Sequence, residues 1–175
     1  MNVPQNVLDA LTGACQRHGV ELALALGLST VESGLDPNAR GDYDAAGVPH
    51  SFGLMQLYDA GAGYGHTPEE LLNLDNNTEW GCSYLRACLD AFPGDIFTGV
   101  SAYNQGIGGA RSRGWEFNAP YVRRVLDFRD QYRDQGFASV PTTPTKPGCW
   151  SLGALLIIIA IGAILKLGGV IFHAC

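Results

Sequence analysis

The chain has 175 residues, of which 46% are hydrophobic and 16% are charged. This composition excludes a disordered acidic chain and a highly charged coiled coil. All 17 acidic residues and nine arginines precede residue 136, and the formal net charge is −6. Because nucleic-acid binding needs a basic face that neutralises phosphates, the acidic body argues against a nucleic-acid partner.

Residues 1–136 are predicted to form one mainly helical domain. Apolar residues recur at helical spacing between Val7 and Cys15, and Gly19 is a natural end for this first helix. Residues 21–31 are more apolar and predict a central helix that runs into Glu32. The polar, glycine-rich stretch Pro37–Phe52 is expected to form a loop or a small hairpin.

The second half of this domain carries signals for four further helices. Thr67 is an expected N-cap, because Pro68 follows it and Glu70 completes a capping box. Longer helices are expected over residues 75–92, 95–103 and 118–135. Together these elements predict a mainly α domain with a small loop or hairpin insertion.

The C-terminal part differs in composition from this domain. Residues 137–149 are rich in proline and threonine and predict an extended linker. Residues Leu152–Phe172 are apolar or glycine except for Lys166, and as a helix they would span about 31 Å, enough to cross a bilayer. We therefore expect a single transmembrane helix over residues 150–173, with a buried core helix as the alternative.

Export and cysteine signals are weak. The N-terminus lacks the basic and apolar regions of a signal peptide. The five cysteines have no CxxC spacing, so a zinc site or a redox dithiol is not expected; buried free thiols are expected, with a structural disulfide as the alternative. No metal and no cofactor is expected.

Three short motifs point to chemistry when they are considered together. They are Glu32-Ser33-Gly34, the stretch SFGLMQL at residues 51–57, and SAYNQG at residues 101–106. Taken singly, each is typical of an ordinary helix end or helix start. In this order and spacing they resemble the soluble lytic transglycosylase family, relatives of goose-type lysozyme with the lysozyme-like fold. The resemblance covers roughly residues 20–130, and Tyr58-Asp-Ala-Gly replaces the proline-x-threonine-alanine that usually follows the second motif.

The resemblance implies cleavage of the β-1,4 bond between N-acetylmuramic acid and N-acetylglucosamine in peptidoglycan, with a 1,6-anhydro product. Glu32 would be the single catalytic acid and later the base, and the apolar run before it favours the desolvation that such an acid needs. The family's other motif residues would contact the substrate or line its cleft: Ser33, Met55, Gln56, Tyr103 and Asn104. For Met55 a place in the core is the alternative.

Two other functions stay open. A hydrolytic muramidase would need a second carboxylate, for which Asp42 and Asp44 are candidates, although both are also ordinary turn residues. A membrane-tethered wall-binding or structural protein could keep the fold without activity. Glu79 is expected to be structural, paired with an arginine of the last helix, and His50 and His66 are read as loop histidines.

The missing export signal and the expected C-terminal anchor favour a bacteriophage origin. The chain resembles virion-associated transglycosylases of phages with an internal membrane, which implies a role in phage entry or host lysis. The expected location is a virion internal membrane or the host envelope. The expected partners are glycan strands, the lipid bilayer through residues 150–173, and virion membrane or capsid proteins. A bacterial membrane-bound transglycosylase is the nearest alternative.

Overall fold

The computed structural model describes residues 2–137. The predicted linker beyond Phe137 and the predicted transmembrane helix at 150–173 lie outside the described residues. Within residues 2–137, no helix combines the length and the apolar character that crossing a bilayer requires. The elements, in chain order, are α1 (Gln5–His18), α2 (Leu22–Ser33), β1 (Arg40–Gly41), β2 (Ser51–Phe52), β3 (Leu57–Tyr58), α3 (Pro68–Leu72), α4 (Leu74–Asp90), α5 (Ile96–Gln105), α6 (Ile107–Arg113), a 3₁₀ helix (Trp115–Asn118), α7 (Ala119–Tyr132) and a π turn (Arg133–Phe137).

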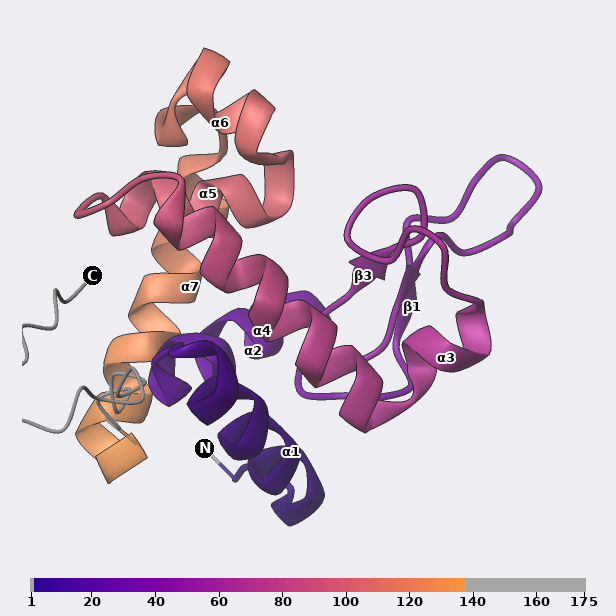
Figure 1. Ribbon diagram of the computed structural model, residues 1–175, viewed down its shortest axis with the longest axis horizontal. Helices are drawn as coiled ribbons and strands as arrows, with labels where there is room; N and C mark the ends of the chain where they lie inside the picture. Colours follow the sequence, from indigo (N-terminus) through magenta and orange to yellow (C-terminus); the bar gives the residue numbers. More distant parts are fainter. Residues whose placement is uncertain (1, 138–175) are drawn as a thin grey trace, which may run out of the picture. The chain divides into compact units, whose positions relative to one another are not determined.

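The helix α2 is the centre of the core. Its residues 22–29 are all buried, and it packs lengthwise on α7, while α1 packs on α4 and α4 on α5 (Figure 1). Gly27 permits the close approach of α2 and α7, because a Cβ at this position would lie 2.7 Å from the carbonyl oxygen of Val125. The predicted ends of the first helices are confirmed, since Gly19 ends α1 in the left-handed conformation at φ 64°.

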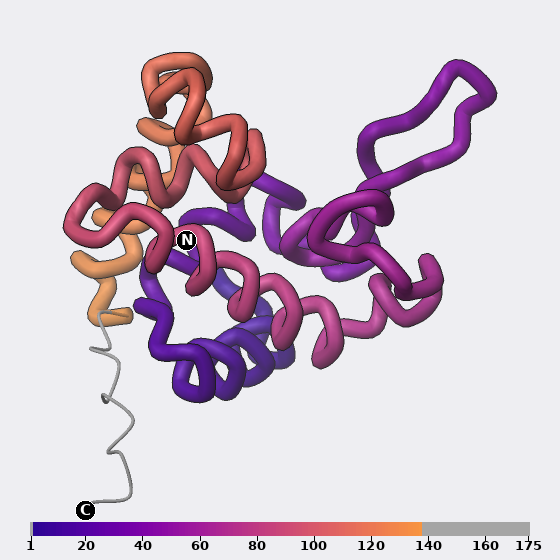
Figure 2. Tube along the Cα trace, turned by 45° about the horizontal axis from the view of Figure 1, so that its top comes forward, coloured from indigo at the N-terminus to yellow at the C-terminus, as the bar shows by residue number. Residues whose placement is uncertain are grey.

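A small β region stands beside the helices. Strands β1, β2 and β3 form an antiparallel sheet in that order, with Arg40 opposite Phe52 and Phe52 opposite Leu57. Phe52, Leu57 and Leu71 form a separate apolar cluster beneath this sheet. The loop between β1 and β2 extends away from the sheet (Figure 2). The region therefore has its own small core and forms one side of a cleft.

The structure modifies several sequence-based expectations. The expected small hairpin is a three-stranded sheet, because residues 53–56 form a turn, with φ 77° at Gly53 and φ 47° at Gln56. The capping box at Thr67 is confirmed, although α3 ends after five residues. Helix α6 was not expected from its glycine-rich sequence, and α7 ends at Tyr132, three residues earlier than expected.

Candidate active site

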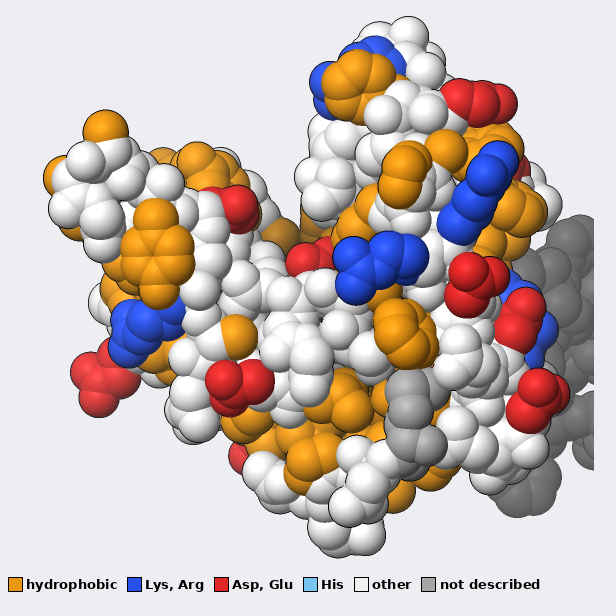
Figure 3. Space-filling model, turned by 180° about the vertical axis from the view of Figure 1, so that it is seen from behind, with side chains coloured by type: hydrophobic (Ala, Val, Ile, Leu, Met, Phe, Trp, Pro, Cys, Tyr) orange, Lys and Arg blue, Asp and Glu red, His pale blue; other side chains and the backbone are white. Residues whose placement is uncertain are grey.

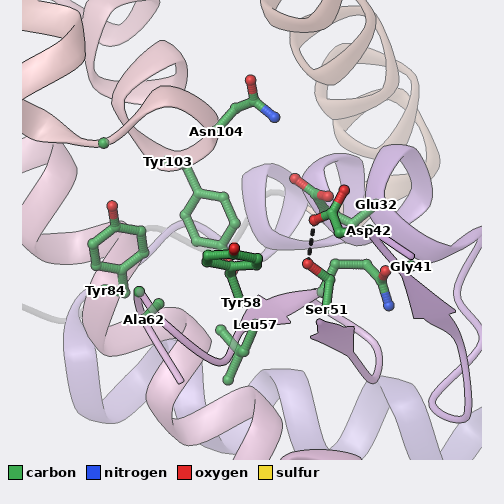
Figure 4. A pocket seen from close by; sticks show the side chains of 13 residues that line it. Glu32, Gly41, Asp42, Ser51, Leu57, Tyr58, Ala62, Tyr84, Tyr103 and Asn104 are labelled. Atoms are coloured by element: carbon green, nitrogen blue, oxygen red, sulfur yellow. Dashed lines mark hydrogen bonds between the residues drawn. The ribbon is translucent and has the colours of Figure 1, made fainter. Parts of the chain in front are cut away.

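A cleft of about 550 Å³ lies between the β region and the helices (Figure 4). Its floor and walls come from the end of α2, the sheet, the loop after β3, α4 and the end of α5. The lining residues are Glu32, Gly41, Asp42, Ser51, Gln56, Leu57, Tyr58, Gly61, Ala62, Tyr84, Tyr103, Asn104 and Gly106. The cleft thus brings together all three motifs that the sequence indicated.

Glu32 is a buried acid in this cleft. It lies in the last turn of α2, and Gly34 ends the helix directly after it at φ 66°. Burial raises the pKa of Glu32 to about 7, a hydrogen bond from Tyr121 lowers it, and the negative charge of Asp42 raises it. A large fraction of this carboxyl group is therefore protonated at neutral pH, which is the state that a general acid requires.

Tyr121 is the hydrogen-bond partner of Glu32, and none of the three sequence motifs contains it. Its hydroxyl donates to Oε1 of Glu32 at 2.5 Å from the first turn of α7. Burial beside Glu32 holds the pKa of the Tyr121 hydroxyl well above its usual value, so the hydroxyl keeps its proton and acts as a donor. A usable signal existed, because Tyr121 lies one helical turn before Val125 on the inner side of the helix.

The turn at residues 53–56 borders the cleft. It contains Met55 and is held by hydrogen bonds from Ser33 and Tyr103. Ser33 Oγ donates to the carbonyl oxygen of Leu54 at 2.7 Å, and the Tyr103 hydroxyl donates to that of Met55 at 2.9 Å. Met55 is fully buried, and neither Ser33 nor Met55 lines the cleft. Contact of these two side chains with a substrate therefore stays a prediction, while their contacts hold the 53–56 turn against α2 and α5.

Gln56 and Asn104 do line the cleft. Gln56 Nε2 donates to the carbonyl oxygens of Gly53 at 2.9 Å and Ala39 at 3.2 Å, so its side chain ties the turn to the residue before β1. Asn104 Oδ1 accepts a hydrogen bond from Asn118 at 3.1 Å. Both are exposed enough to offer a polar group to a ligand.

Asn77 is a second residue of the site that lies outside the three sequence motifs. It is fully buried on α4, where its Oδ1 accepts from the Met55 amide at 2.8 Å. Its Nδ2 donates to the carbonyl oxygens of Phe52 at 2.9 Å and Leu71 at 2.7 Å. One side chain thus satisfies three backbone groups, one just before the turn, one within it and one on α3, and it helps to fix the turn that carries Gln56.

The two candidate second carboxylates lie in different places. Asp42 lines the cleft, adopts φ 51° and accepts a hydrogen bond from the Ser51 hydroxyl. Figure 4 shows its carboxyl group close to that of Glu32. Asp44 lies outside the cleft in the β1–β2 loop, where the amides of Val48 and Ala46 each donate to it at 2.8 Å and lower its pKa. Only Asp42 is therefore brought to Glu32.

Aromatic side chains form much of the remaining wall. The rings of Tyr84 and Tyr103 are tilted with centroids 5.2 Å apart, and Tyr58 presents an exposed ring at the edge of the sheet. Flat apolar faces combined with a few polar groups are typical of a pocket for an organic ligand such as a sugar.

The remaining titratable residues singled out in the sequence lie away from the reactive centre. Glu79 is structural, but its partners are Arg17 at 2.7 Å and His18 at 2.8 Å on α1, so the expected pairing with the last helix was wrong. His50 is hydrogen-bonded to Asp59 at 2.9 Å, and His66 stacks on Trp80. Cys15, Cys82 and Cys88 are buried free thiols, as expected.

Comparisons with known proteins agree with this geometry. Residues 9–119 match the family described as transglycosylase SLT domain. The membrane-bound lytic murein transglycosylases C of Haemophilus influenzae strains PittEE and PittGG are 31% identical over 112 residues, covering 58% of this chain and 31% of theirs. The chain thus spans less than a third of the length of these relatives.

Two solved structures share the fold. An inactive mutant of the lytic transglycosylase Slt from Pseudomonas aeruginosa has a TM-score of 0.61 at 21% identity, covering 75% of this chain and 25% of that one. The 70 kDa soluble lytic transglycosylase of Escherichia coli has a TM-score of 0.59 at 22% identity, with the same coverage. The mainly helical fold expected from the sequence is thereby confirmed.

Proposed function

Since the chain belongs to the transglycosylase SLT domain family, we propose that it is a peptidoglycan lytic transglycosylase. It cleaves the β-1,4 bond between N-acetylmuramic acid and N-acetylglucosamine and leaves a 1,6-anhydro end. The observation that carries this proposal is the buried carboxyl group of Glu32, whose pKa is raised to about 7 inside a cleft lined by aromatic rings.

The hydrogen bond from Tyr121 assigns different tasks to the two oxygens of Glu32. Because Oε1 accepts the hydrogen bond from the tyrosine hydroxyl, the acidic proton of Glu32 resides on Oε2. In the first step Oε2 protonates the leaving oxygen O4 while the bond from C1 to O4 breaks. In the second step the carboxylate takes the proton of the sugar's 6-hydroxyl, and O6 bonds to C1. No water is consumed, and Glu32 ends protonated as it began.

This scheme requires the substrate to stabilise the positive charge at C1 with its own N-acetyl oxygen. The cleft's contribution is to hold that group in place. Gln56, Tyr103 and Asn104 are the polar residues proposed for this task, and their position on the cleft wall supports it. Ser33 and Met55 would act through the turn that carries Gln56.

A hydrolytic muramidase is the second candidate, and Asp42 is the observation that favours it. Its carboxylate faces the same cleft and is close enough to Glu32 to raise the pKa of that group. An inverting hydrolase would use such a carboxylate to activate water at C1. Asp44 has no place in this scheme, because it does not line the cleft and its Oδ1 accepts hydrogen bonds from two loop amides.

Mass spectrometry of the products released from purified peptidoglycan tests both candidates. Products about 18 Da lighter than the hydrolytic ones contain the 1,6-anhydro end, whereas ordinary reducing ends identify a hydrolase. Glu32→Gln should abolish release. The matched control is Glu79→Gln, which changes a glutamate of α4 that pairs with Arg17 of α1 away from the cleft and should keep release. No release by the unchanged chain would reject both enzymes and leave a wall-binding protein.

We further propose that residues 150–173 tether this enzyme to a lipid bilayer, in a virion or in the host envelope, for phage entry or host lysis. The support is the apolar composition of Leu152–Phe172, interrupted only by Lys166. The full chain should then float with lipid vesicles and resist extraction by alkaline carbonate. Its presence in purified phage particles would support the virion role, and its confinement to a bacterial envelope fraction would reject it.

A further inference from the structure

Arginine side chains are concentrated in one part of this acidic protein. Residues 96–126 contain four arginines and one acidic residue, Glu116, whereas the other residues up to 136 contain five arginines and 16 acidic residues. Most of the basic side chains visible in Figure 3 lie on the lobe that stands opposite the β region. The four are Arg111, Arg113, Arg123 and Arg124, all exposed.

These four arginines differ from most others in their pairing. Arg17, Arg86, Arg129 and Arg133 each form an ion pair with a carboxylate. Within residues 2–137, none of the four exposed arginines is paired with an acidic side chain. They are therefore free to bind an anion from outside the protein.

Two of the four are connected to the cleft through neighbouring residues, although neither lines it. Arg124 follows Tyr121 by one turn on the same side of α7, and Tyr121 is bonded to Glu32. The guanidinium of Arg113 lies 4.0 Å from the centre of the Phe117 ring. The residue after Phe117 is Asn118, which donates to Asn104 on the cleft wall. We call Arg113 and Arg124 the arginine rim.

The opposite side of the cleft is mainly acidic, because residues 36–70 contain six acidic residues and a single arginine, Arg40 on β1. Asp42 lies in the cleft, and Asp44 and Asp59 flank His50 in the β region. A ligand with carboxylates on one side is attracted to the arginine rim and repelled by the β region. The charge distribution therefore gives a bound glycan a preferred orientation.

We propose that the arginine rim binds the carboxylates of the peptide stems attached to the muramic acid residues of the glycan. This proposal rests on the proposed function. It adds that the peptide stem is the part of the substrate that decides which glycans are cleaved. Stacking on Phe117 holds the Arg113 guanidinium in place while its edge stays free for two parallel hydrogen bonds to a carboxylate. The peptide stems would thus be bound outside the reactive centre that contains Glu32.

The other two arginines provide a matched control. The guanidinium of Arg111 lies 6.0 Å from the centre of the Phe92 ring, which lines a separate hollow with Arg86, Pro93 and Ile96. Arg123 follows Tyr121 by two residues and so projects from a different side of α7. Removing this pair changes the net charge as much as removing the arginine rim does.

The test compares soluble glycan strands that carry stems with the same strands after an amidase has removed them. For the full 175-residue chain, kcat/KM should be higher on strands with stems. In Arg113→Ala/Arg124→Ala the ratio of the two values should fall about tenfold, mainly through KM. Arg113→Lys/Arg124→Lys should restore part of it, since lysine keeps the charge without the bidentate geometry. Arg111→Ala/Arg123→Ala should keep the ratio of the unchanged chain.

An unchanged ratio in the rim variant, or an equal fall in the control, would overturn the proposal. Binding of the Glu32→Gln variant to the two sets of strands tests the stem site independently of cleavage. It therefore distinguishes failure of the stem site from failure of the proposed function. Preference for stems without any cleavage would reject the enzyme and keep the stem site. Equal affinity for both sets would reject the stem site whatever the activity.

Discussion

Tyr121 donates a hydrogen bond of 2.5 Å to Oε1 of Glu32, and it comes from a helix 89 residues further along the chain. The bond opposes the effect of burial, because it stabilises the ionised carboxylate while desolvation destabilises it. Burial has the larger effect, and the pKa settles at about 7 instead of 4.5. Tyr121 is therefore a positioning residue that also adjusts the acidity of the catalytic group.

Tyr121→Phe should move the alkaline side of the pH–activity profile to higher pH. The reaction begins from protonated Glu32, so kcat/KM falls as the pH rises through the pKa of that group. Without the tyrosine bond this pKa rises further above 4.5. We also expect kcat to fall roughly tenfold, because the carboxyl group loses its orientation.

The matched control is Tyr132→Phe, which removes a hydroxyl shared between α7 and Thr30 of α2 away from the cleft. Its pH profile should keep the position of the unchanged chain. A profile that shifts equally in both variants would mean that loosening of α7, and not the bond to Glu32, causes the change.

Asp42→Asn should move the same side of the profile in the opposite direction. The negative charge of Asp42 raises the pKa of Glu32, so its removal lowers that pKa and reduces the protonated fraction at pH 7.5. In a transglycosylase, activity at pH 5 should remain. In a hydrolase that uses Asp42 as its base, activity should be lost at every pH. Asp44→Asn, an equal change of charge in the same loop outside the cleft, should leave the profile in place.

Glu32→Gln should stabilise the fold at high pH. At pH 4 the carboxyl group is protonated in both the folded and the unfolded chain, so the two proteins should be equally stable. As the pH rises from 4.5 through 7 the unfolded chain ionises first, and the folded state of the unchanged protein loses stability that the glutamine variant keeps. The expected difference in the free energy of unfolding is about 3 kcal/mol at pH 8.

Denaturant unfolding at pH 4 and pH 8 measures this difference. Glu79→Gln should have the opposite sign, because the pKa of Glu79 is lowered by Arg17 and His18, so its ionised form stabilises the fold above pH 4.5. A Glu32→Gln protein with no gain at pH 8 would show that Glu32 is not desolvated in the folded state.

Local rules in the sequence account for the helix ends but not for the completed site. Gly19 and the capping box at Thr67 act over a few residues, so their positions could be read directly. Glu32 could be proposed because the order of three motifs is itself a sequence property. Helical spacing places Tyr121 on the inner side of α7, but its bond to Glu32, like the bonds of Asn77, acts across helix contacts that no short stretch of sequence encodes.

The turn at residues 53–56 is a second case in which tertiary contacts, and not the local sequence, determine the structure. An apolar stretch such as GLMQL is compatible with a helix start, and the backbone instead turns because Asn77, Ser33 and Tyr103 bind its peptide groups. The tertiary contacts outweigh the local preference, and Gln56 consequently adopts φ 47°.

Asn77→Ala should therefore destabilise the protein and remove activity together. The change leaves the Met55 amide and the carbonyl oxygens of Phe52 and Leu71 without their partner, at a cost of about 3 kcal/mol. Thermal unfolding and peptidoglycan release measure the two effects. Asn76→Ala is the control. The side-chain Nδ2 of Asn76 donates one long hydrogen bond of 3.5 Å to the Glu70 carbonyl oxygen, so its loss should cost little stability. Equal stability of the two variants would contradict the role given to Asn77.

Gly27→Ala tests whether the contact of α2 with α7 sets the geometry of the acid. The added methyl group would lie 2.7 Å from both the Val125 carbonyl oxygen and the Arg129 amide, and neither backbone atom can move without moving α7. We expect a loss of about 2–3 kcal/mol in the free energy of unfolding, which outweighs the gain of about 1 kcal/mol in helix propensity. The displaced α7 should also weaken the bond from Tyr121 to Glu32, so the pH profile should shift as in Tyr121→Phe.

The control for this change is Gly13→Ala on α1, where the new methyl group meets the mobile end of Arg17 at 3.2 Å. Here the helix propensity should dominate, and the stability should stay equal or rise by up to about 1 kcal/mol. Urea unfolding of the two variants and their pH profiles provide the measurement. If Gly27→Ala is as stable as Gly13→Ala, the helices can separate without cost, and close packing of α2 on α7 is not what holds Tyr121 against the catalytic acid.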